Sequence, residues 1–240
     1  MLLTGRELKS EARRLIISNA PRVFLIGIVY LLFITIISEL QYRLSGMELY
    51  FEQFYERLLA GELPTPKMLV SGLRMPGIAL ALLIMLFQPV IKTGYMSYCL
   101  KLTRNDAADF RSLLDGFMFF IKVIAISVIN SLLVWIGAIL FIFPGVIVHY
   151  MYRQAYYILL DNPNKGVIHC LRESRQLMRR NKLDLFLIDI SFLGWVIIDM
   201  IVVIMLPLPF SFPIIQIWLA PFSGLTYAQY YNHLIGRLAV

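Results

Sequence analysis

The chain contains several apolar runs of about the length that crosses a bilayer as a helix, roughly 20 residues. Apolar residues make up 59% of its 240 residues and charged residues 15%, against about 45–50% and about 25% in ordinary soluble domains. Because backbone polar groups in lipid must be satisfied within the segment itself, each run is expected to be helical. The composition therefore predicts an all-α membrane protein and leaves no tract for a separate soluble domain.

Six of these runs are expected to cross the membrane, within a single polytopic domain that covers residues 1–240. We place the spans at 23–40, 77–100, 118–143, 146–160, 183–206 and 212–234. Four amphipathic segments are expected to be surface helices, and they lie at 4–18, 47–60, 106–115 and 164–182. The turn between the third and fourth spans is expected at Pro144-Gly145. Asn162 and Pro163 are expected to start the last surface helix, as its N-cap and its first residue.

Lys and Arg residues are unevenly distributed between the loops of this six-span arrangement. Fifteen fall on one side and four on the other, all four in the external segment 41–76. Cytoplasmic loops are enriched in Lys and Arg, so the distribution predicts a multi-pass cell-membrane protein with both termini in the cytoplasm. It also explains the net charge of +7 without nucleic acid, which is not an expected partner.

An internal repeat relates residues 12–28 to residues 174–190 with a shift of 162 positions. The identical pairs are Arg13/Arg175, Leu15/Leu177, Asn19/Asn181, Phe24/Phe186, Leu25/Leu187, Ile26/Ile188 and Ile28/Ile190. The amphipathic segment before Phe117 also precedes two apolar runs. We therefore expect three repeated units, each a cytoplasmic surface helix followed by a two-span hairpin, arranged in parallel about the membrane normal.

A series of motifs, in order along the chain, resembles a known family. They are Thr4, Glu7-Leu8-Lys9, Ala12-Arg13, Asp115-Gly116-Phe117, Phe143-Pro144-Gly145, Tyr150 to Leu160, Asp161-Asn162-Pro163, Ser174 with Leu177-Met178, and Leu185-Phe186 through Ser191-Phe192-Leu193-Gly194-Trp195. Together they resemble the bacterial integral-membrane family called domain of unknown function 975. The resemblance implies a multi-pass bacterial membrane protein without an assigned activity or agreed catalytic residues. The chain departs from the family pattern in its long segment 41–76.

Motifs for catalysis, metal binding or phosphate binding are missing from the sequence. The three His residues are scattered, at His149, His169 and His233, and Cys99 and Cys170 have no metal-ligand spacing. We therefore predict no catalytic residues, no metal site and no cofactor. Tyrosines near the C-terminus are expected in the interfacial aromatic belt, and they are Tyr227, Tyr230 and Tyr231.

Four ionisable residues fall within predicted spans at similar depths, about 8 to 12 Å from the cytoplasmic ends at 1.5 Å per residue. They are Lys92, Lys122, Arg153 and Asp189. In one interpretation the two lysines reach the headgroups while Arg153 pairs with Asp189 as a structural contact. In the other, the four form a basic site for an anionic lipid headgroup or a small anionic solute.

A second basic feature is the surface helix 164–182, which is expected to lie on anionic lipid headgroups. Its basic residues share one arc of the helix, and they are Lys165, Arg172, Arg175, Arg179 and Lys182.

Two classes of function remain open. The first is a non-enzymatic protein that binds or moves an anionic lipid or amphiphile, or assists partner membrane proteins. The second is a membrane-embedded enzyme that acts on a lipid headgroup, with Asp189, Arg153 and His149 as candidate residues. A His and an Asp within hydrogen-bond reach of each other would favour the enzyme. In either class the expected partners are the lipid bilayer and its anionic headgroups.

Overall fold

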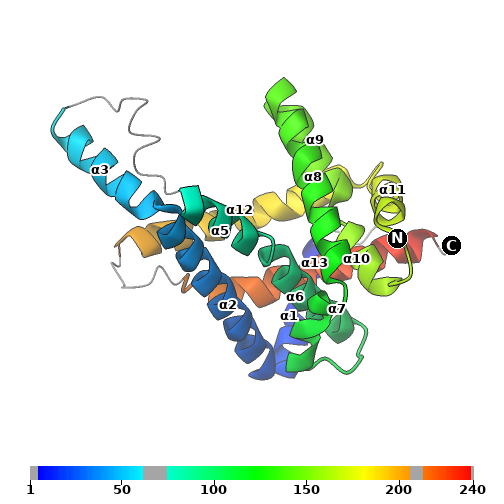
Figure 1. Ribbon diagram of the computed structural model, residues 1–240. Helices are drawn as coiled ribbons and strands as arrows, with labels where there is room; N and C mark the ends of the chain where they lie inside the picture. The colour runs from blue at the N-terminus through cyan, green and yellow to red at the C-terminus, as the bar shows by residue number, and fades with distance from the viewer. Residues whose placement is uncertain (1–4, 62–74, 206–212, 239–240) are drawn as a thin grey trace. The chain divides into compact units, whose positions relative to one another are not determined.

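The computed structural model describes residues 5–61, 75–205 and 213–238, and these residues form helices and turns without a strand (Figure 1). The predicted all-α class is therefore confirmed for the described part of the chain. The chain divides into two compact units. The larger combines Met1–Leu31 with Pro89–Val240, and the smaller is Leu32–Gln88.

In chain order the described helices are α1 (Gly5–Asn19), α2 (Arg22–Ser45), α3 (Met47–Leu59), α5 (Met75–Met85), α6 (Gln88–Thr103), the 3-10 helix η1 (Phe110–Leu114), α7 (Asp115–Met118), α8 (Phe120–Leu140), α9 (Ile142–Tyr152), α10 (Ala155–Asp161), α11 (Val167–Leu177), α12 (Lys182–Met205) and α13 (Gln216–Leu238). Helices α1 and α3 lie close to the predicted 4–18 and 47–60, with Thr4 outside the described residues.

Four stretches among the described residues are long and apolar enough to cross a membrane. They are Arg22–Ser45, Gly77–Thr103, Phe120–Ile139 and Lys182–Val203. These stretches indicate membrane association and coincide with the first, second, third and fifth predicted spans. The second consists of α5 and α6, separated by a turn before Gln88. The remaining spans, predicted at 146–160 and 212–234, correspond to α9 with α10 and to α13, and stay predictions; residues 206–212 lie outside the described part.

The turn between α8 and α9 lies at Phe141, whose backbone is extended. The prediction of a turn at Pro144-Gly145 is wrong, because both residues belong to α9. Pro144 is tolerated there since an N–H group in the first helical turn has no intrahelical acceptor. The glycines serve close packing instead. A Cβ on Gly137 would lie 3.0 Å from the Cα of Gly145, so α8 and α9 run side by side with their backbones almost in contact (Figure 1).

Two predicted surface helices have different bounds in the structure. Within 106–115, residues 106–109 are not helical, and the 3-10 helix η1 begins only at Phe110. The last surface helix, predicted at 164–182, is the shorter α11, with Gly166 as its N-cap. Asn162 and Pro163 therefore do not start this helix. Pro163 lies in the turn before it, because the chain must reverse direction between α10 and α11.

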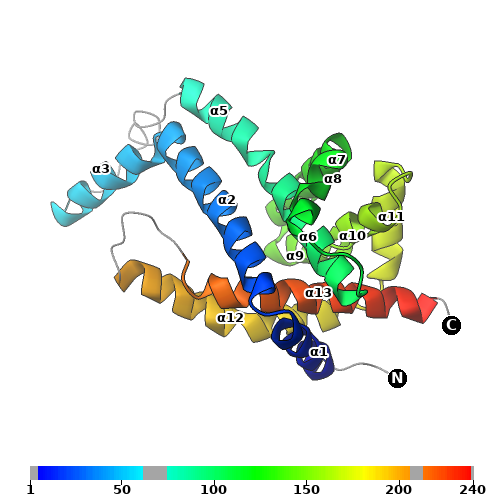
Figure 2. The ribbon, with the colours of Figure 1, turned by 90° about the horizontal axis from the view of Figure 1, so that it is seen from below.

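Helices α1 and α11 bury their apolar faces against protein rather than leaving them free for lipid. In α1 the buried residues are Leu8, Ala12 and Ile16, and the helix packs against α12 and α13 (Figure 2). In α11 the buried residues include Cys170 and Ser174, and this helix packs against α8, α9 and α10. The outer faces of both helices carry most of their charged residues.

The two segments related by the internal repeat share details of structure. Asn19 Nδ2 donates to the Leu15 carbonyl at 2.9 Å, and Asn181 Nδ2 donates to the Leu177 carbonyl at 2.8 Å. In each segment this bond closes a surface helix just before a long apolar helix begins. The buried pairs related by the shift of 162 are Leu8/Cys170, Ala12/Ser174, Ile16/Met178, Val23/Leu185 and Ile26/Ile188.

The smaller unit contains the C-terminal part of α2 together with α3 and α5. Gln88 Nε2 contacts Gln41 Oε1 at 3.3 Å and Ser38 Oγ at 3.4 Å. An i,i+4 ion pair joins Arg43 to Glu39 at 2.7 Å on α2. Part of the predicted external segment 41–76, residues 62–74, lies outside the described residues.

Candidate functional site

Asp189 on α12 is the centre of a polar cluster that also involves α9 and α13. The Tyr150 hydroxyl donates to its Oδ2 at 2.7 Å, and the Tyr227 hydroxyl donates to its Oδ1 at 2.8 Å. Arg153 Nη1 also donates to Oδ2 and forms an ion pair with the carboxylate. Both carboxylate oxygens are therefore already engaged by protein donors.

Arg153 lies at the break between α9 and α10. Its guanidinium carbon is 4.3 Å from the centroid of the Tyr227 ring and 5.9 Å from that of Tyr150, so cation–π attraction adds to the ion pair. Ser174 of α11 donates its hydroxyl at 2.9 Å to the Met151 carbonyl beside the break. The break therefore places Arg153 in the cluster, and the Ser174 hydroxyl provides a hydrogen-bond donor for the Met151 carbonyl beside it.

The next residue, Gln154, contributes a buried polar group at the same break. Its side chain is 2% exposed, and its Oε1 atom has no hydrogen-bond donor among the described residues. The break thus contains an uncharged acceptor whose hydrogen-bonding capacity is unused within the described part of the chain.

Lys92 on α6 is exposed and makes no hydrogen bond or ion pair with any residue that the structure describes. It lies close enough to Arg153 to be repelled by it and close enough to Asp189 to be attracted. With two cations and one carboxylate, the formal charge of these three residues is +1. The ring of His149 packs edge-to-face against Tyr150, with centroids 5.6 Å apart, and interacts electrostatically with the same three residues.

Lys122 is not part of this cluster. Its ammonium donates to the backbone carbonyls of Pro163 and Lys165, and it therefore fastens the loop between α10 and α11. Of the four residues grouped by depth, the structure brings together Lys92, Arg153 and Asp189. The predicted pair of Arg153 with Asp189 is present.

The basic residues of the segment 164–182 do not share one helical arc, because the helix is shorter than predicted. Arg172 and Arg175 lie on α11 and are exposed, whereas Arg179 follows in the next turn and Lys182 begins α12. Lys165 precedes the helix and pairs with Glu173 at 2.6 Å. The exposed arginines still face away from the buried side of α11.

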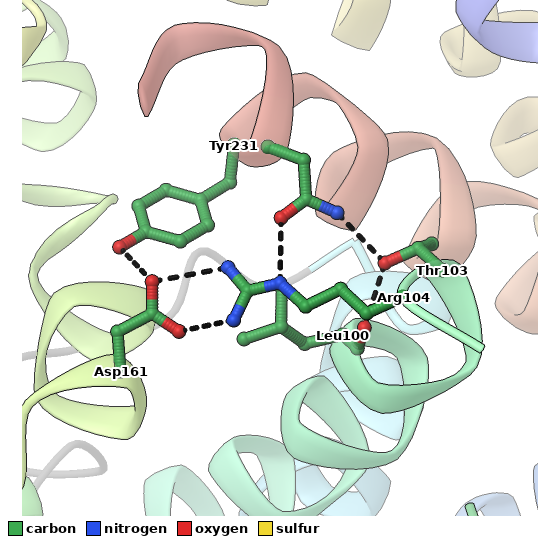
Figure 3. A network of polar contacts seen from close by, with 6 residues as sticks. Leu100, Thr103, Arg104, Asp161 and Tyr231 are labelled. Carbon is green, nitrogen blue, oxygen red and sulfur yellow. Dashed lines mark hydrogen bonds and ion pairs between the residues drawn. The ribbon is translucent and has the colours of Figure 1, made fainter. Parts of the chain in front are cut away.

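A second polar network connects the ends of α6 and α10 to α13 (Figure 3). Arg104 forms two hydrogen bonds with the Asp161 carboxylate, at 2.6 and 3.0 Å, and the Tyr231 hydroxyl donates to the same carboxylate at 2.8 Å. Arg104 Nε also donates to Asn232 Oδ1 at 3.0 Å, and Asn232 Nδ2 to Thr103 Oγ1 at 2.9 Å. The hydrogen bonds to Asp161 raise the pKa of Arg104. Every charge here has a partner, so we interpret the network as structural.

The sequence pattern does not indicate that tyrosines of α13 bind charged groups, as Tyr227 and Tyr231 do. Tyr230 and Tyr231 are 3% and 2% exposed, so their assignment to an interfacial belt is wrong. Tyr230 donates to the Asn181 carbonyl at 2.6 Å, and Tyr227 to Asp189 as described above. The only sequence signal for the Tyr227 contact is depth: a tyrosine predicted at the same depth as a carboxylate within a span is a candidate hydrogen-bond donor to it.

Comparison with known families addresses the part of the chain that holds most of this cluster. Residues 133–237 match the model of the family described as protein of unknown function (DUF975). The match confirms the family resemblance over these residues. The DUF975 region includes Tyr150, Arg153, Asp189 and Tyr227, whereas Lys92 precedes it. Comparisons with curated proteins and with solved structures gave no match.

Proposed function

We propose that the chain is a multi-pass protein of the cell membrane that binds an anionic lipid or amphiphile at Lys92 and Arg153. In this proposal α9 with α10 and α13 complete six spans, and both termini are cytoplasmic. The four long apolar stretches and the uneven distribution of Lys and Arg support it. Movement of the bound molecule, or its presentation to a partner membrane protein, would use the same site.

The observation that carries the proposal is the unpaired charge of Lys92. This residue lies within an apolar stretch, Gly77–Thr103, and a charged side chain within a bilayer is costly unless it finds a partner. The nearby carboxylate of Asp189 is already bonded to Arg153 and two tyrosine hydroxyls. An anion bound between Lys92 and Arg153 would satisfy the remaining donors of both residues.

The enzymatic alternative has less support from the geometry. Among the described residues no hydrogen bond joins His149 to Asp189, and the His149 ring instead packs against the ring of Tyr150. A carboxylate that accepts from one guanidinium and two phenols is poorly placed to take a proton from a substrate. We therefore favour binding over catalysis for this cluster.

The test compares two lysines that carry the same charge in different surroundings. The variant Lys92→Gln should lose most of the anionic lipid that co-purifies with the detergent-extracted protein, measured by native mass spectrometry. Lys122→Gln is the matched control, because it removes an equal charge from the loop contact outside the cluster, and it should keep the lipid. A wild-type lipid complement in Lys92→Gln would reject the proposal.

A further inference from the structure

The Lys92–Arg153 site contains donors for an anion, and the carboxylate beside it, that of Asp189, is already paired with Arg153. We infer that it selects phosphate headgroups without an amine, such as phosphoglycerol, over headgroups that carry an ammonium group, such as phosphoethanolamine. The inference rests on the proposed function and names the class of ligand that this site would take.

Asp189 is the one carboxylate among the described residues that interacts electrostatically with both Lys92 and His149. Its Oδ1 accepts from Tyr227, and its Oδ2 accepts from Tyr150 and Arg153. The charge of this carboxylate is already paired with Arg153, so an ammonium group entering the site would have to compete with Arg153 for it. The amide oxygen of Gln154 is buried and therefore not exposed to an entering headgroup.

The net charge of the cluster also favours a headgroup without an amine. Lys92, Arg153 and Asp189 together carry a formal +1, which one phosphodiester charge neutralises. A zwitterionic headgroup brings its own positive charge close to two cations and leaves the total unchanged. Arg153 contacts Asp189 and also Tyr227, and the rest of its five N–H groups, together with the three of Lys92, remain to donate to phosphate oxygens.

The experiment measures the headgroup preference of the full-length, delipidated protein in detergent. Phosphatidylglycerol and phosphatidylethanolamine with identical acyl chains compete for binding, and native mass spectrometry reads the bound fractions. We expect at least a roughly tenfold preference for phosphatidylglycerol, reduced toward equality in Lys92→Gln and unchanged in Lys122→Gln. Displacement of either lipid by free glycerol phosphate would identify a soluble phosphate ester, rather than a lipid, as the ligand, and would overturn the lipid part of the inference.

A gain of binding provides a sharper test than a loss. Tyr227→Phe removes the donor to Asp189 Oδ1, which frees a carboxylate oxygen for an ammonium group. This variant should bind phosphatidylethanolamine several-fold better relative to phosphatidylglycerol. The control is Tyr231→Phe, one turn further along α13, which removes a hydroxyl that contacts Asp161 instead and should leave the preference unchanged.

The outcomes separate this inference from the proposed function. If both lipids bind equally and both are lost in Lys92→Gln, the site exists but the headgroup selectivity is wrong. If neither lipid responds to Lys92→Gln, the proposed function and the inference both fail. A preference unaffected by Tyr227→Phe would show that the hydrogen bonds to the Asp189 carboxylate are not the cause of selectivity.

Discussion

The junction between α1 and α2 and the junction between α11 and α12 have the same construction but differ at one decisive position. In each, an asparagine bonds the carbonyl four residues earlier, and the apolar positions are buried in the same pattern. A shift of 162 residues places Gly27 of the first junction opposite Asp189 of the second. A Cβ on Gly27 would lie 3.1 Å from Pro221 on α13, whereas Asp189 accepts three hydrogen bonds.

This difference separates the structural frame from the site. Buried apolar residues and the asparagine bond are sufficient to position a surface helix before a long apolar helix, and both junctions have them. The first junction uses the position for a close approach of two helices. The second places a carboxylate there, and the arginine and tyrosines gather around it. Charge chemistry is therefore a property of the second junction alone in this pair.

The largest expected effect concerns the side of the membrane on which the two junctions lie. Ser18 and Arg180 are equivalent, exposed positions, and the native Cys99 and Cys170 are 1% and 0% exposed. Burial also raises the pKa of Cys170, which reduces its reactivity further. Parallel repeats predict that Ser18→Cys and Arg180→Cys are both protected from an impermeant maleimide in intact cells and both labelled after permeabilisation. Labelling of one alone from outside would contradict the parallel arrangement.

The next largest effect tests the charged position of the second junction. Arg153→Ala should lower the free energy of unfolding by about 3 kcal/mol, because it leaves the Asp189 carboxylate without its cation. The double variant with Asp189→Asn should recover much of this loss, since the unpaired charge is then removed. Thermal unfolding in detergent measures both. Equal melting temperatures for the wild type and Arg153→Ala would show that the pair contributes nothing to stability.

The corresponding position of the first junction should be sensitive to size rather than charge. Gly27→Ala should cost about 1–3 kcal/mol, because the new methyl group presses on the Pro221 ring. Gly194→Ala on α12 is the matched control. A Cβ there has no neighbour within 4 Å, so the substitution should be neutral or slightly stabilising. Similar melting temperatures for the two variants would argue against the close helix approach.

The smallest effect concerns the feature that the junctions share. Asn19→Ala and Asn181→Ala each remove a side-chain bond to a helix carbonyl, and each should cost about 1 kcal/mol. Equal costs, measured by thermal unfolding of the single variants, would support a common frame. A much larger loss of stability in one variant would mean that the two asparagines have different structural roles.

The helices were predictable because apolar runs of bilayer length have few alternatives to helix formation. The residues at which the helices begin and end are harder to predict. Pro144 fits a turn, yet a proline also fits the first turn of a helix, and sequence alone does not distinguish the two. The last surface helix was predicted too long because its charge pattern continues beyond Leu177, where the Asn181 side chain already closes the helix.

The candidate site was predictable in part. Counting residues from the helix ends gives depth along an axis, and it groups Lys92 with Arg153 and Asp189, of which the structure pairs the last two. Depth does not give direction around the helix, so Lys122 was grouped with them although it contacts the loop at Pro163. The contact of Tyr227 with Asp189 joins α12 and α13 in three dimensions. No spacing within either helix contains that information.

The close contact of Gly137 with Gly145 also bears on how the chain is made. Helix α9 has 11 residues, a length of about 16 Å, which is about half of a hydrocarbon core. Alone, α9 is too short to cross a bilayer. In the proposed six-span arrangement, we expect α8 and α9 to insert together as a hairpin, because their backbones lie almost in contact and the longer helix can carry the shorter one into the membrane.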